Sequence, residues 1–341
     1  MMRLPHFRFH APRELREAAE LLAGAAPGEA MLVAGGTDLL PNMKRRQQVP
    51  KALVSLRHIA ELRSISNGDG YALGAGVTLS EIVRHPQLRA ACTGLWQAAA
   101  QVATPHLRNM GTLGGNLCLD TRCNYYDQNY EWRKAIDFCM KKDGKTCWVA
   151  TSSPTCLAVS STDTAPALIA LGATATLVSA GGSRRIPVGE LYRNDGIQYL
   201  SRMPHEILAV VHLPRLDGWR STYWKLRRRG SFDFPVLSVA AAVKIGREGV
   251  VDEARIVLGA VASRPLDAAE AARSLVGQPL TDAAIANAAE QAARPARPMD
   301  NTDFSLHWRK RVARDFVTYA LRELRGDDVR PIRHRIARQL L

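Results

Sequence analysis

Hydrophobic residues in the first third of the chain alternate between helical and strand spacing. Small and aliphatic residues recur three and four apart over 12–22, which predicts a helix with one buried face. Short apolar runs predict strands at 31–33, 52–56 and 71–77. Thr78 and Glu81 match the capping-box pattern, so a short helix should follow Thr78, and a second helix of small residues is expected over 95–102. This alternation indicates an α/β arrangement in the N-terminal part.

Strand patterns dominate the chain after Glu206. Before that point, apolar residues predict a helix over 163–171, which Gly172 should end, and a strand over 174–178. Four strand-like segments then predict a separate antiparallel sheet: 207–213, 222–226, 237–245 and 254–260. Helices are expected last, at 266–275, at 282–293 and in a segment whose apolar residues recur every four positions from Val312 to Leu324. The overall pattern predicts an α+β fold.

Residues 119–159 interrupt this regular pattern. They carry four of the six cysteines, two adjacent tyrosines and mixed charges, with no sustained helical or strand period. The regular pattern resumes at Asp163, so the segment reads as an insertion. We expect four regions: an N-terminal α/β subdomain at 1–56, a second subdomain at 57–217 that contains the insertion, a C-terminal α+β domain at 218–330 and a basic tail at 331–341.

Composition and charge narrow the class of protein. The 341 residues are 46% hydrophobic, as in globular proteins, and no apolar run reaches the roughly 18 residues needed to cross a bilayer. The first residues lack the apolar core of a signal peptide, so we expect a cytoplasmic protein. The formal net charge of +14 comes from mostly scattered basic residues without an aromatic–basic motif, which argues against nucleic-acid binding. Solvated surfaces or docking of acidic partner proteins account for this charge equally well.

Two glycine-rich segments stand where ligand loops occur in α/β proteins. The first, AGGTD at 34–38, directly follows the strand predicted at 31–33. The second contains Gly111, Gly114 and Gly115, and these glycines allow the positive φ angles in which successive N–H groups line an anion-binding nest. The spacing matches neither the phosphate loop of nucleoside triphosphatases nor the dinucleotide fingerprint. A plain turn is the alternative, in the second case between a helix and a following strand.

The cysteines in the insertion are candidates for metal ligation. In a reducing compartment, burial or metal binding is a better expectation than a disulfide framework. Four of these cysteines are separated by 15, 7 and 8 residues: Cys123, Cys139, Cys147 and Cys156. This spacing is neither the paired C-x-x-C of structural zinc nor the compact ferredoxin run, so it leaves the metal open. Cys92 stands apart from the group.

The glycine segments resemble those of the flavoprotein subunits of the molybdenum hydroxylase family, which includes xanthine dehydrogenase and carbon monoxide dehydrogenase. The matching stretches are LVAGGTDLL at 32–40, RNMGTLGGN at 108–116 and STDTAPAL at 161–168. The resemblance covers nearly the whole chain except the insertion. It implies a two-part FAD-binding domain of the vanillyl-alcohol oxidase type, followed by a C-terminal antiparallel sheet with helices of the carbon monoxide dehydrogenase flavoprotein type.

The same resemblance implies which residues bind FAD. The pyrophosphate is expected at the backbone of both glycine segments, with Thr104 and Arg108 nearby. Asp163 is expected toward the ribityl or ribose hydroxyls, although it could instead cap its helix, and Lys225 near the flavin ring, although it could only close a strand. The full set implied is Ala34, Gly35, Gly36, Thr37, Asp38, Leu39, Thr104, Arg108, Gly111, Thr112, Leu113, Gly114, Gly115, Asn116, Asp163 and Lys225. No residue of this chain is expected to act on the substrate itself, since cofactors carry the electron transfer.

The insertion resembles that of the β subunits of 4-hydroxybenzoyl-CoA reductases, a branch of the same family. The likeness rests on RCNYYDQ at 122–128, DFC at 137–139 and TCW at 146–148. It implies a 4Fe-4S cluster with four ligands: Cys123, Cys139, Cys147 and Cys156. Cys118 is an alternative first ligand by position, but it belongs to the second glycine segment, where relatives also carry a small residue, so it is assigned no iron.

This second resemblance implies an electron-transfer function. Electrons would pass from a low-potential donor such as ferredoxin toward reductive dehydroxylation to benzoyl-CoA in anaerobic aromatic degradation. The molybdenum cofactor would lie on a large partner subunit and two 2Fe-2S clusters on a small one, in a dimer of heterotrimers. Two alternatives stay open. One is the FAD subunit of a related hydroxylase of the xanthine or CO dehydrogenase type that oxidises an aromatic substrate, and the other is a non-catalytic binding subunit whose cysteines hold structural zinc.

Overall fold

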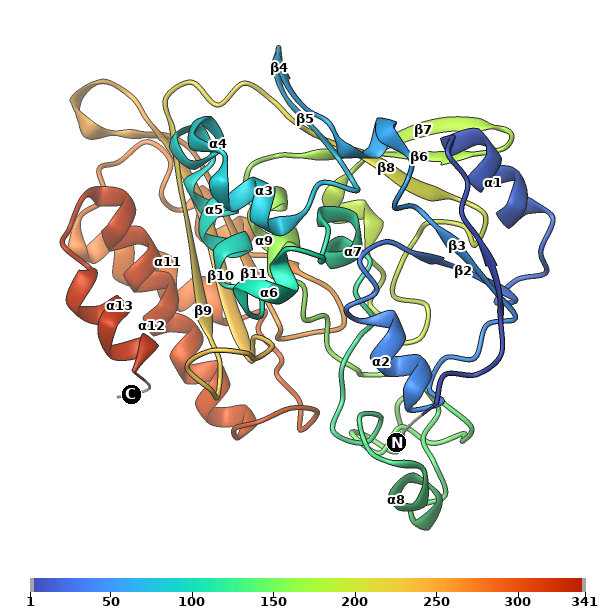
Figure 1. Ribbon diagram of the computed structural model, residues 1–341. Helices are drawn as coiled ribbons and strands as arrows, with labels where there is room; N and C mark the ends of the chain where they lie inside the picture. Colours follow the sequence, from blue (N-terminus) through green and yellow to red (C-terminus); the bar gives the residue numbers. More distant parts are fainter. Residues whose placement is uncertain (1–2, 339–341) are drawn as a thin grey trace.

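The N-terminal unit is a small parallel sheet with two helices packed against it (Figure 1). The computed structural model describes residues 3–338 and orders this sheet β1-β3-β2. Its elements are β1 (Arg8–His10), α1 (Leu15–Ala23), β2 (Ala30–Val33), α2 (Leu39–Lys44) and β3 (Ala52–Ser55). The helix and both strands predicted here are confirmed, since α1 buries Leu15, Ala18, Ala19 and Leu22 in a core shared with Val54 of β3.

A five-stranded antiparallel sheet forms the second unit, in the order β4-β5-β8-β6-β7. Its strands and short 3₁₀ turns are η1 (Ala60–Arg63), β4 (Ile65–Gly68), β5 (Gly70–Gly74), β6 (Thr174–Ser179), β7 (Gly182–Pro187), η2 (Val188–Leu191) and β8 (Ile207–Leu213). Its helices are α3 (Leu79–Arg84), α4 (Pro86–Ala91), α5 (Thr93–Ala100), α6 (Pro105–Arg108), α7 (Leu113–Leu117) and α9 (Thr164–Ala170).

Two predictions in this unit have different outcomes. The capping box is confirmed, because the Thr78 side chain accepts from the Glu81 amide while the Glu81 carboxylate accepts from the Thr78 amide. The assignment of 207–213 to a separate C-terminal sheet is wrong. Strand β8 pairs with both β5 and β6, so its apolar residues fill the core of the second unit.

The C-terminal unit is a four-stranded antiparallel sheet of order β12-β11-β10-β9. Its elements are β9 (Trp219–Leu226), β10 (Leu237–Ile245), η3 (Arg247–Gly249), β11 (Val251–Gly259), β12 (Leu266–Asp267), α10 (Ala269–Arg273), α11 (Asp282–Ala293), α12 (Leu306–Arg325) and α13 (Arg330–Ala337). The helix predicted over 266–275 is wrong at its start, where β12 pairs with β11 before α10 begins. Most of the described part of the predicted basic tail is helical, as α13, and Ile332 and Ile336 pack against the core.

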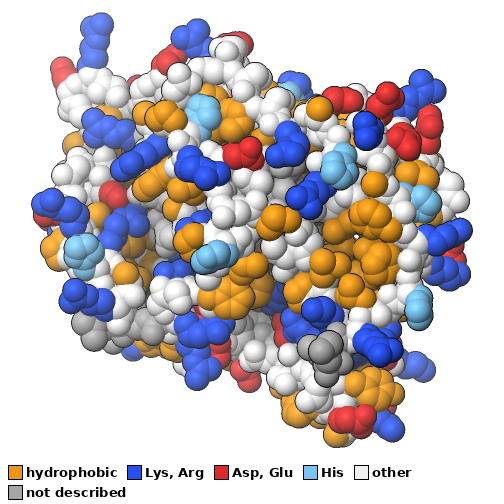
Figure 2. Space-filling model, viewed as in Figure 1, with side chains coloured by type: hydrophobic (Ala, Val, Ile, Leu, Met, Phe, Trp, Pro, Cys, Tyr) orange, Lys and Arg blue, Asp and Glu red, His pale blue; other side chains and the backbone are white. Residues whose placement is uncertain are grey.

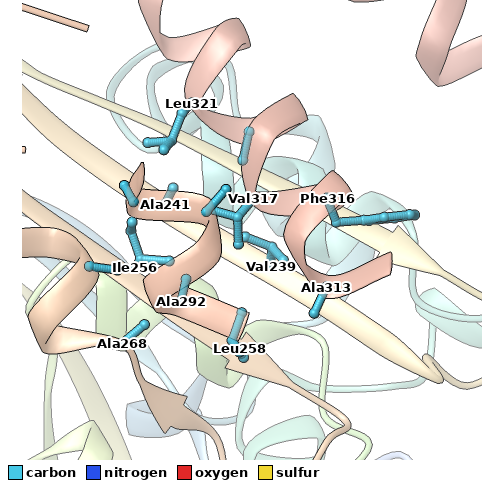
Figure 3. Packing of buried hydrophobic residues seen from close by; sticks show 14 of the residues in the cluster. Val239, Ala241, Ile256, Leu258, Ala268, Ala292, Ala313, Phe316, Val317 and Leu321 are labelled. Carbon is cyan, nitrogen blue, oxygen red and sulfur yellow. The ribbon is translucent and has the colours of Figure 1, made fainter. Parts of the chain in front are cut away.

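Strand β10 joins the C-terminal unit to the rest of the fold because its side chains alternate between the two faces of the sheet. Val239 and Ala241 point toward α11 and α12, where they pack with Phe316 and Val317 (Figure 3). Ala240 on the other face packs in a separate cluster with residues of α5 and α9. Helices therefore cover both faces of this sheet, and α9 carries the segment at Asp163 into the space between the units.

The insertion forms a lobe beside α2 (Figure 1). Helix α8 (Tyr130–Ala135) is the one α-helix described within residues 119–159, and the remainder consists of turns. Arg122 and Val159 exchange backbone hydrogen bonds of 2.8 and 2.7 Å, which close the base of the lobe. Across residues 3–338, none of the helices has both the length and the apolar character required to cross a bilayer.

Candidate functional site: a large cavity beside four converging cysteines

A cavity of about 590 Å³ opens between the first glycine segment and the second unit, within the usual size range of cofactor sites. Most of the residues predicted to bind FAD line it: Ala34, Gly35, Gly36, Thr37, Asp38, Leu39, Gly111, Thr112, Gly114, Gly115, Asn116 and Asp163. Four predicted residues do not line it: Thr104, Arg108, Leu113 and Lys225. The structure thus brings three distant sequence segments to one surface.

The first glycine segment has the geometry of an anion-binding nest. It connects the end of β2 to the start of α2, and Gly36 has a φ of +69°. Within residues 3–338, the backbone amides from Gly35 to Asp38 donate no hydrogen bond to a protein acceptor. Four successive free N–H groups at the wall of a cavity suit an anionic ligand such as a phosphate.

The nest predicted at the second glycine segment is wrong. Gly111, Gly114 and Gly115 all have ordinary negative φ angles, and their amides already donate to protein oxygens of Leu107, Ala75 and Thr112 at 2.7, 2.8 and 3.1 Å. No strand follows either, because α7 begins at Leu113. Glycine is required here for close packing, since a Cβ at position 114 would lie 2.7 Å from the Ala75 Cβ.

The two glycine segments touch each other. A Cβ on Gly35 would lie 1.8 Å from the carbonyl oxygen of Met110, just before the second segment. Only a residue without a side chain lets the two backbones approach this closely. The second segment therefore acts as a support that fixes the position of the nest.

Asp163 does not cap helix α9 with its side chain. The cap comes instead from Asn116, whose Oδ1 accepts from the Thr164 amide at 3.0 Å and the Thr164 hydroxyl at 2.7 Å. The carboxylate of Asp163 accepts from the Tyr223 hydroxyl at 2.6 Å and from Lys225 Nζ at 3.0 Å. Because Asn116 caps the helix, the Asp163 carboxylate is available to form a buried ion pair at the cavity wall.

This ion pair lies away from water. The Lys225 side chain is 0% exposed and that of Asp163 is 3% exposed. Burial raises the pKa of Asp163 and lowers that of Lys225, and the attraction between the two charges opposes both shifts. Lys225 also donates to the carbonyl of Gln101 at 3.1 Å, so it reaches the cavity only through Asp163.

Arg108 and Thr104 support the cavity from outside. The guanidinium of Arg108 donates to the carbonyl of Val102 at 2.7 Å, and Val102 lines the cavity. Thr104 caps α6 by accepting from the Leu107 amide at 3.3 Å. Leu113 is buried in the hydrophobic core of the second unit.

Sequence reasoning missed several residues of the cavity wall. Ser161 is 2% exposed, and its hydroxyl has no hydrogen-bond partner within residues 3–338, so it is available to a ligand. Tyr199 and Arg202 come from the segment before β8, and Phe232 and Phe234 from the loop after β9. Only Ser161 lay in a recognisable motif, while the loop residues carry no pattern in the sequence that points to a ligand.

All four cysteines of the insertion converge on one small buried cavity, together with Tyr126 and Lys141. The cysteines are 4 to 6% exposed. Burial raises the pKa of Cys123 to about 12 and that of Cys156 to about 11, so metal ligation there must displace protons. The amide of Ala158 points at the Cys156 sulfur at 3.5 Å, a donor suited to a ligated thiolate.

Four buried cysteine thiols can ligate either a zinc ion or an iron–sulfur cluster. A zinc ion bonds to sulfur at about 2.3 Å, which draws four sulfurs to within about 4 Å of one another. Among residues 3–338, no group of three or more Cys, His, Asp or Glu side chains is arranged to hold a single metal ion. The free volume between the cysteines is about 10 Å³, roughly one water, so an inorganic cluster also requires the thiols to rotate outward.

The other two cysteines lie elsewhere. Cys118 lines the large cavity and does not line the four-cysteine cavity. Burial raises its pKa, and nearby Arg202 opposes this shift. Cys92 is 0% exposed in the core of the second unit, where burial raises its pKa to about 12.

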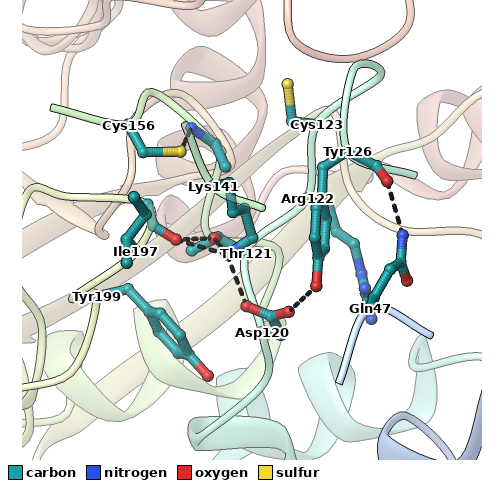
Figure 4. A network of polar contacts seen from close by, with 12 residues as sticks. Gln47, Asp120, Thr121, Arg122, Cys123, Tyr126, Lys141, Cys156, Ile197 and Tyr199 are labelled. Atoms are coloured by element: carbon teal, nitrogen blue, oxygen red, sulfur yellow. Dashed lines mark hydrogen bonds and ion pairs between the residues drawn. The ribbon is translucent and has the colours of Figure 1, made fainter. Parts of the chain in front are cut away.

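A polar network forms the wall between the two cavities (Figure 4). The carboxylate of Asp120 accepts from Lys141 Nζ at 2.8 Å and from the Tyr126 hydroxyl at 3.2 Å. Lys141 also donates to the Thr121 hydroxyl at 2.8 Å and to the Gly196 carbonyl at 2.6 Å. Asp120 lines the large cavity while Lys141 and Tyr126 line the small one, so the two sites share this wall.

On the face shown in Figure 2, the positive charge does not gather into one patch. Lys and Arg side chains are spread over the visible surface among acidic and apolar ones (Figure 2). Around the insertion, Lys134 and Lys145 are balanced by Glu131 and Asp137, which are likewise exposed. The prediction that basic residues dock an acidic donor therefore receives no specific support from the charges of the lobe.

Comparison with known proteins agrees with this geometry. Residues 5–216 match the family described as FAD binding domain in molybdopterin dehydrogenase, and residues 221–324 match the CO dehydrogenase flavoprotein C-terminal domain. The aldehyde oxidoreductase FAD-binding subunit PaoB of Escherichia coli is 31% identical, over 82% of this chain and 89% of that protein. The nicotinate dehydrogenase FAD-subunit of Eubacterium barkeri is 29% identical, over 81% of each.

Solved structures support the same grouping. Carbon monoxide dehydrogenase from Hydrogenophaga pseudoflava has a chain with a TM-score of 0.77 and 26% identity, covering 94% of this chain and 97% of its own. Quinoline 2-oxidoreductase from Pseudomonas putida 86 gives a TM-score of 0.74 and 26% identity over 94% and 98%. The predicted fold class is thereby confirmed, and the chain belongs to the family of FAD-binding medium subunits of xanthine dehydrogenase and CO dehydrogenase type molybdenum hydroxylases.

Proposed function

We propose that this chain is the FAD and 4Fe-4S electron-transfer subunit of a molybdenum-containing 4-hydroxybenzoyl-CoA reductase. The observation that carries the proposal is the convergence of Cys123, Cys139, Cys147 and Cys156 on one buried cavity. These residues are far apart in an otherwise irregular insertion, and their meeting is expected if the loop exists to hold a metal cluster. The resemblance of this insertion to that of the reductase β subunits supplies the specific reaction.

FAD is proposed to lie in the large cavity with its pyrophosphate on the free amides between Gly35 and Asp38. Bound FAD would supply the electron-accepting and electron-donating chemistry. Asp163 is proposed to accept hydrogen bonds from cofactor hydroxyls while Lys225 holds its charge in place. Ser161 offers a further unpaired hydroxyl at the same wall.

We propose the same direction of electron flow as in those reductases. A low-potential donor such as ferredoxin would reduce the four-cysteine site, and the electrons would pass through the shared wall at Asp120 toward FAD and the partner subunits. Iron–sulfur clusters ligated by cysteine reach the low potentials that this entry point requires. The chain itself performs no bond chemistry on the substrate, because its residues bind, orient and insulate the cofactors.

The remaining parts of the proposal concern assembly and location. The partners are a large subunit with the molybdenum cofactor and a small subunit with two 2Fe-2S clusters, in a dimer of heterotrimers located in the cytoplasm. Within the chain, we propose an N-terminal subdomain at 1–56, a second subdomain at 57–217 with the insertion at 119–159, and a C-terminal domain at 218–330.

The decisive assay uses the purified complex with 4-hydroxybenzoyl-CoA and a reduced viologen. Substrate-dependent oxidation of the viologen, with release of benzoyl-CoA, is the expected result. Oxidation of an aromatic or purine substrate with an artificial acceptor, without turnover of 4-hydroxybenzoyl-CoA, would instead identify the flavin subunit of an oxidising hydroxylase. Colourless cysteine sites containing zinc would favour the non-catalytic alternative.

A further inference from the structure

The segment 120–123 runs from the large cavity to the four-cysteine cavity. Asp120 faces the large cavity and Cys123 faces the four-cysteine cavity. We propose that Arg122, between them, is a positioning residue. It couples the conformation of the cysteine loop, the part of the insertion from residue 123 to 156, to the nest at Gly35–Asp38. Each site would then stabilise the other. This inference rests on the assignment of the large cavity to FAD.

Arg122 is fixed on the side of the nest by a buried charge contact. Its side chain is 9% exposed, and its guanidinium forms an ion pair with the carboxylate of Asp38, the last residue of the nest. The same guanidinium lies 3.4 Å from Asn42 Oδ1 in α2. Arginine suits this position because its rigid fork can bind two acceptors at once.

On the side of the cysteine loop, backbone hydrogen bonds and an ion pair hold Arg122. Its amide and carbonyl pair with Val159 at the base of the insertion, and its guanidinium lies 3.6 Å from Asp127 Oδ1. Cys123 follows directly in the chain. A change in how Cys123 is held must therefore move the backbone that carries the Arg122 side chain.

A third contact extends the link to the loop after β9. The guanidinium carbon of Arg122 lies 4.9 Å from the centre of the Phe234 ring, and Phe234 lines the large cavity. A separate contact, from Gln47 Nε2 to the Tyr126 carbonyl at 2.6 Å, also holds the loop beside α2. That contact does not reach the nest, so Arg122 is the link whose movement changes the nest itself.

The physical basis of the coupling is electrostatic. The Asp38 carboxylate lines the cavity beside amides that are free to bind a phosphate, and two negative groups at close range repel each other. Arg122 neutralises Asp38. When the cysteine loop loosens, Arg122 withdraws, Asp38 regains its full negative field and the affinity for the pyrophosphate falls. Reciprocity of binding free energies requires that bound FAD also stabilises the cysteine loop.

The test is a double-mutant cycle on FAD affinity, measured by fluorescence titration of the full-length chain after its flavin is removed. Four proteins are compared: wild type, Arg122→Met, Cys123→Ser and the double variant. We expect the dissociation constant to rise about tenfold in Cys123→Ser and about thirtyfold in Arg122→Met, within the range of site-to-site couplings. The double variant should bind no more weakly than Arg122→Met alone.

Two further variants separate this role from simple loss of structure. Arg45→Met is the matched control, because Arg45 also lies 3.6 Å from Asp127 but is not paired with Asp38, so it should leave the FAD affinity within twofold of wild type. Asp38→Asn combined with Arg122→Met should restore most of the lost affinity, since it removes the charge that Arg122 neutralises. If Arg122→Met alone fails to fold, this double variant still tests the proposal, because it leaves no unpaired carboxylate at the nest.

Additive effects of Arg122→Met and Cys123→Ser would overturn the coupling, as would an unchanged FAD affinity in Cys123→Ser. Failure of Asp38→Asn to restore affinity would overturn its electrostatic basis. These outcomes differ from failure of the proposed function. A wild-type chain without iron would refute the cluster while the cycle still measures coupling between loop and nest, and a wild-type chain that binds no FAD would refute the flavin assignment.

Discussion

Replacing Gly35 by alanine should separate the two glycine segments and weaken FAD binding. The new Cβ would lie 1.8 Å from the Met110 carbonyl oxygen and 2.5 Å from its carbonyl carbon. A comfortable C···O contact is about 3.3 Å, so the two backbones must move apart by roughly 1.5 Å. No side chain can relieve this contact by rotating, because both partners are main chain.

The expected loss follows from the hydrogen bonds that the displaced amides can no longer make. A hydrogen bond to a charged group contributes about 1.5 to 3 kcal/mol, so losing one raises the FAD dissociation constant by roughly 10- to 150-fold. Overpacking of this kind also lowers the free energy of unfolding by about 1 to 3 kcal/mol. Both effects should appear together in Gly35→Ala.

The assay is FAD titration by fluorescence, with urea unfolding followed by circular dichroism. Gly24→Ala at the end of α1 is the matched control, because its Cβ would lie 3.5 Å from the nearest atom, the Glu20 carbonyl oxygen. Gly115→Ala should be intermediate, since its Cβ meets only the Thr112 hydroxyl, at 3.0 Å. A folded Gly35→Ala protein whose FAD affinity lies within twofold of wild type would refute the close-approach argument.

Three further predictions concern the buried charges and the flavin. Asp163→Asn leaves the Lys225 charge buried without a counter-ion and should lower the free energy of unfolding by about 3 kcal/mol, so an unchanged urea midpoint would contradict the ion pair. The two hydrogen bonds from Arg184 hold the pKa of Glu206 in the folded protein below its usual value. The stabilisation from these bonds is therefore present above about pH 4.5 and is lost as the pH falls through the lowered pKa of the folded protein. Glu206→Gln should therefore cost about 1 kcal/mol at pH 7 and progressively less as the pH falls through the lowered pKa of folded Glu206, and a difference in urea midpoint that does not shrink on acidification would argue against it. The wild-type protein should release all of its flavin on acid precipitation, and yellow colour retained in the pellet would indicate a covalent link.

Periodicity was a good guide to elements whose residues pack within a single face. Helix α1 was predictable because its apolar spacing fixes which side is buried. The strand at 237–245 was predictable from a nearly continuous apolar run, since both of its faces are buried. Strand β8 was misassigned because its residues are apolar in the same way whether it pairs with β5 and β6 or with β9. Sheet partners are long-range contacts that local spacing does not encode. The proposed domain boundaries stay a prediction.

The features of the candidate site were also predictable only where they depend on local sequence. The first glycine segment could be located from its place after a strand, but the second has its amides committed to Leu107, Ala75 and Thr112, which only the tertiary structure reveals. The cap of α9 by Asn116 could not be predicted either, since Asn116 and the start of α9 lie on separate segments of the chain. The cysteine spacing could not show convergence, because the turns of the insertion decide which thiols meet.

The central claim is that the four cysteines hold an iron–sulfur cluster beside a flavin, and metal analysis of one anaerobic preparation tests it most directly. Iron, acid-labile sulfide, zinc and flavin would be measured on the wild-type chain and on Cys123→Ser, with the electron paramagnetic resonance spectrum of the reduced proteins. We predict about four irons and four sulfides per FAD in the wild type, and loss of the cluster signal in Cys123→Ser while FAD still binds at saturating concentration. Stoichiometric zinc without sulfide in the wild type, or an unchanged cluster signal in Cys123→Ser, would contradict the account.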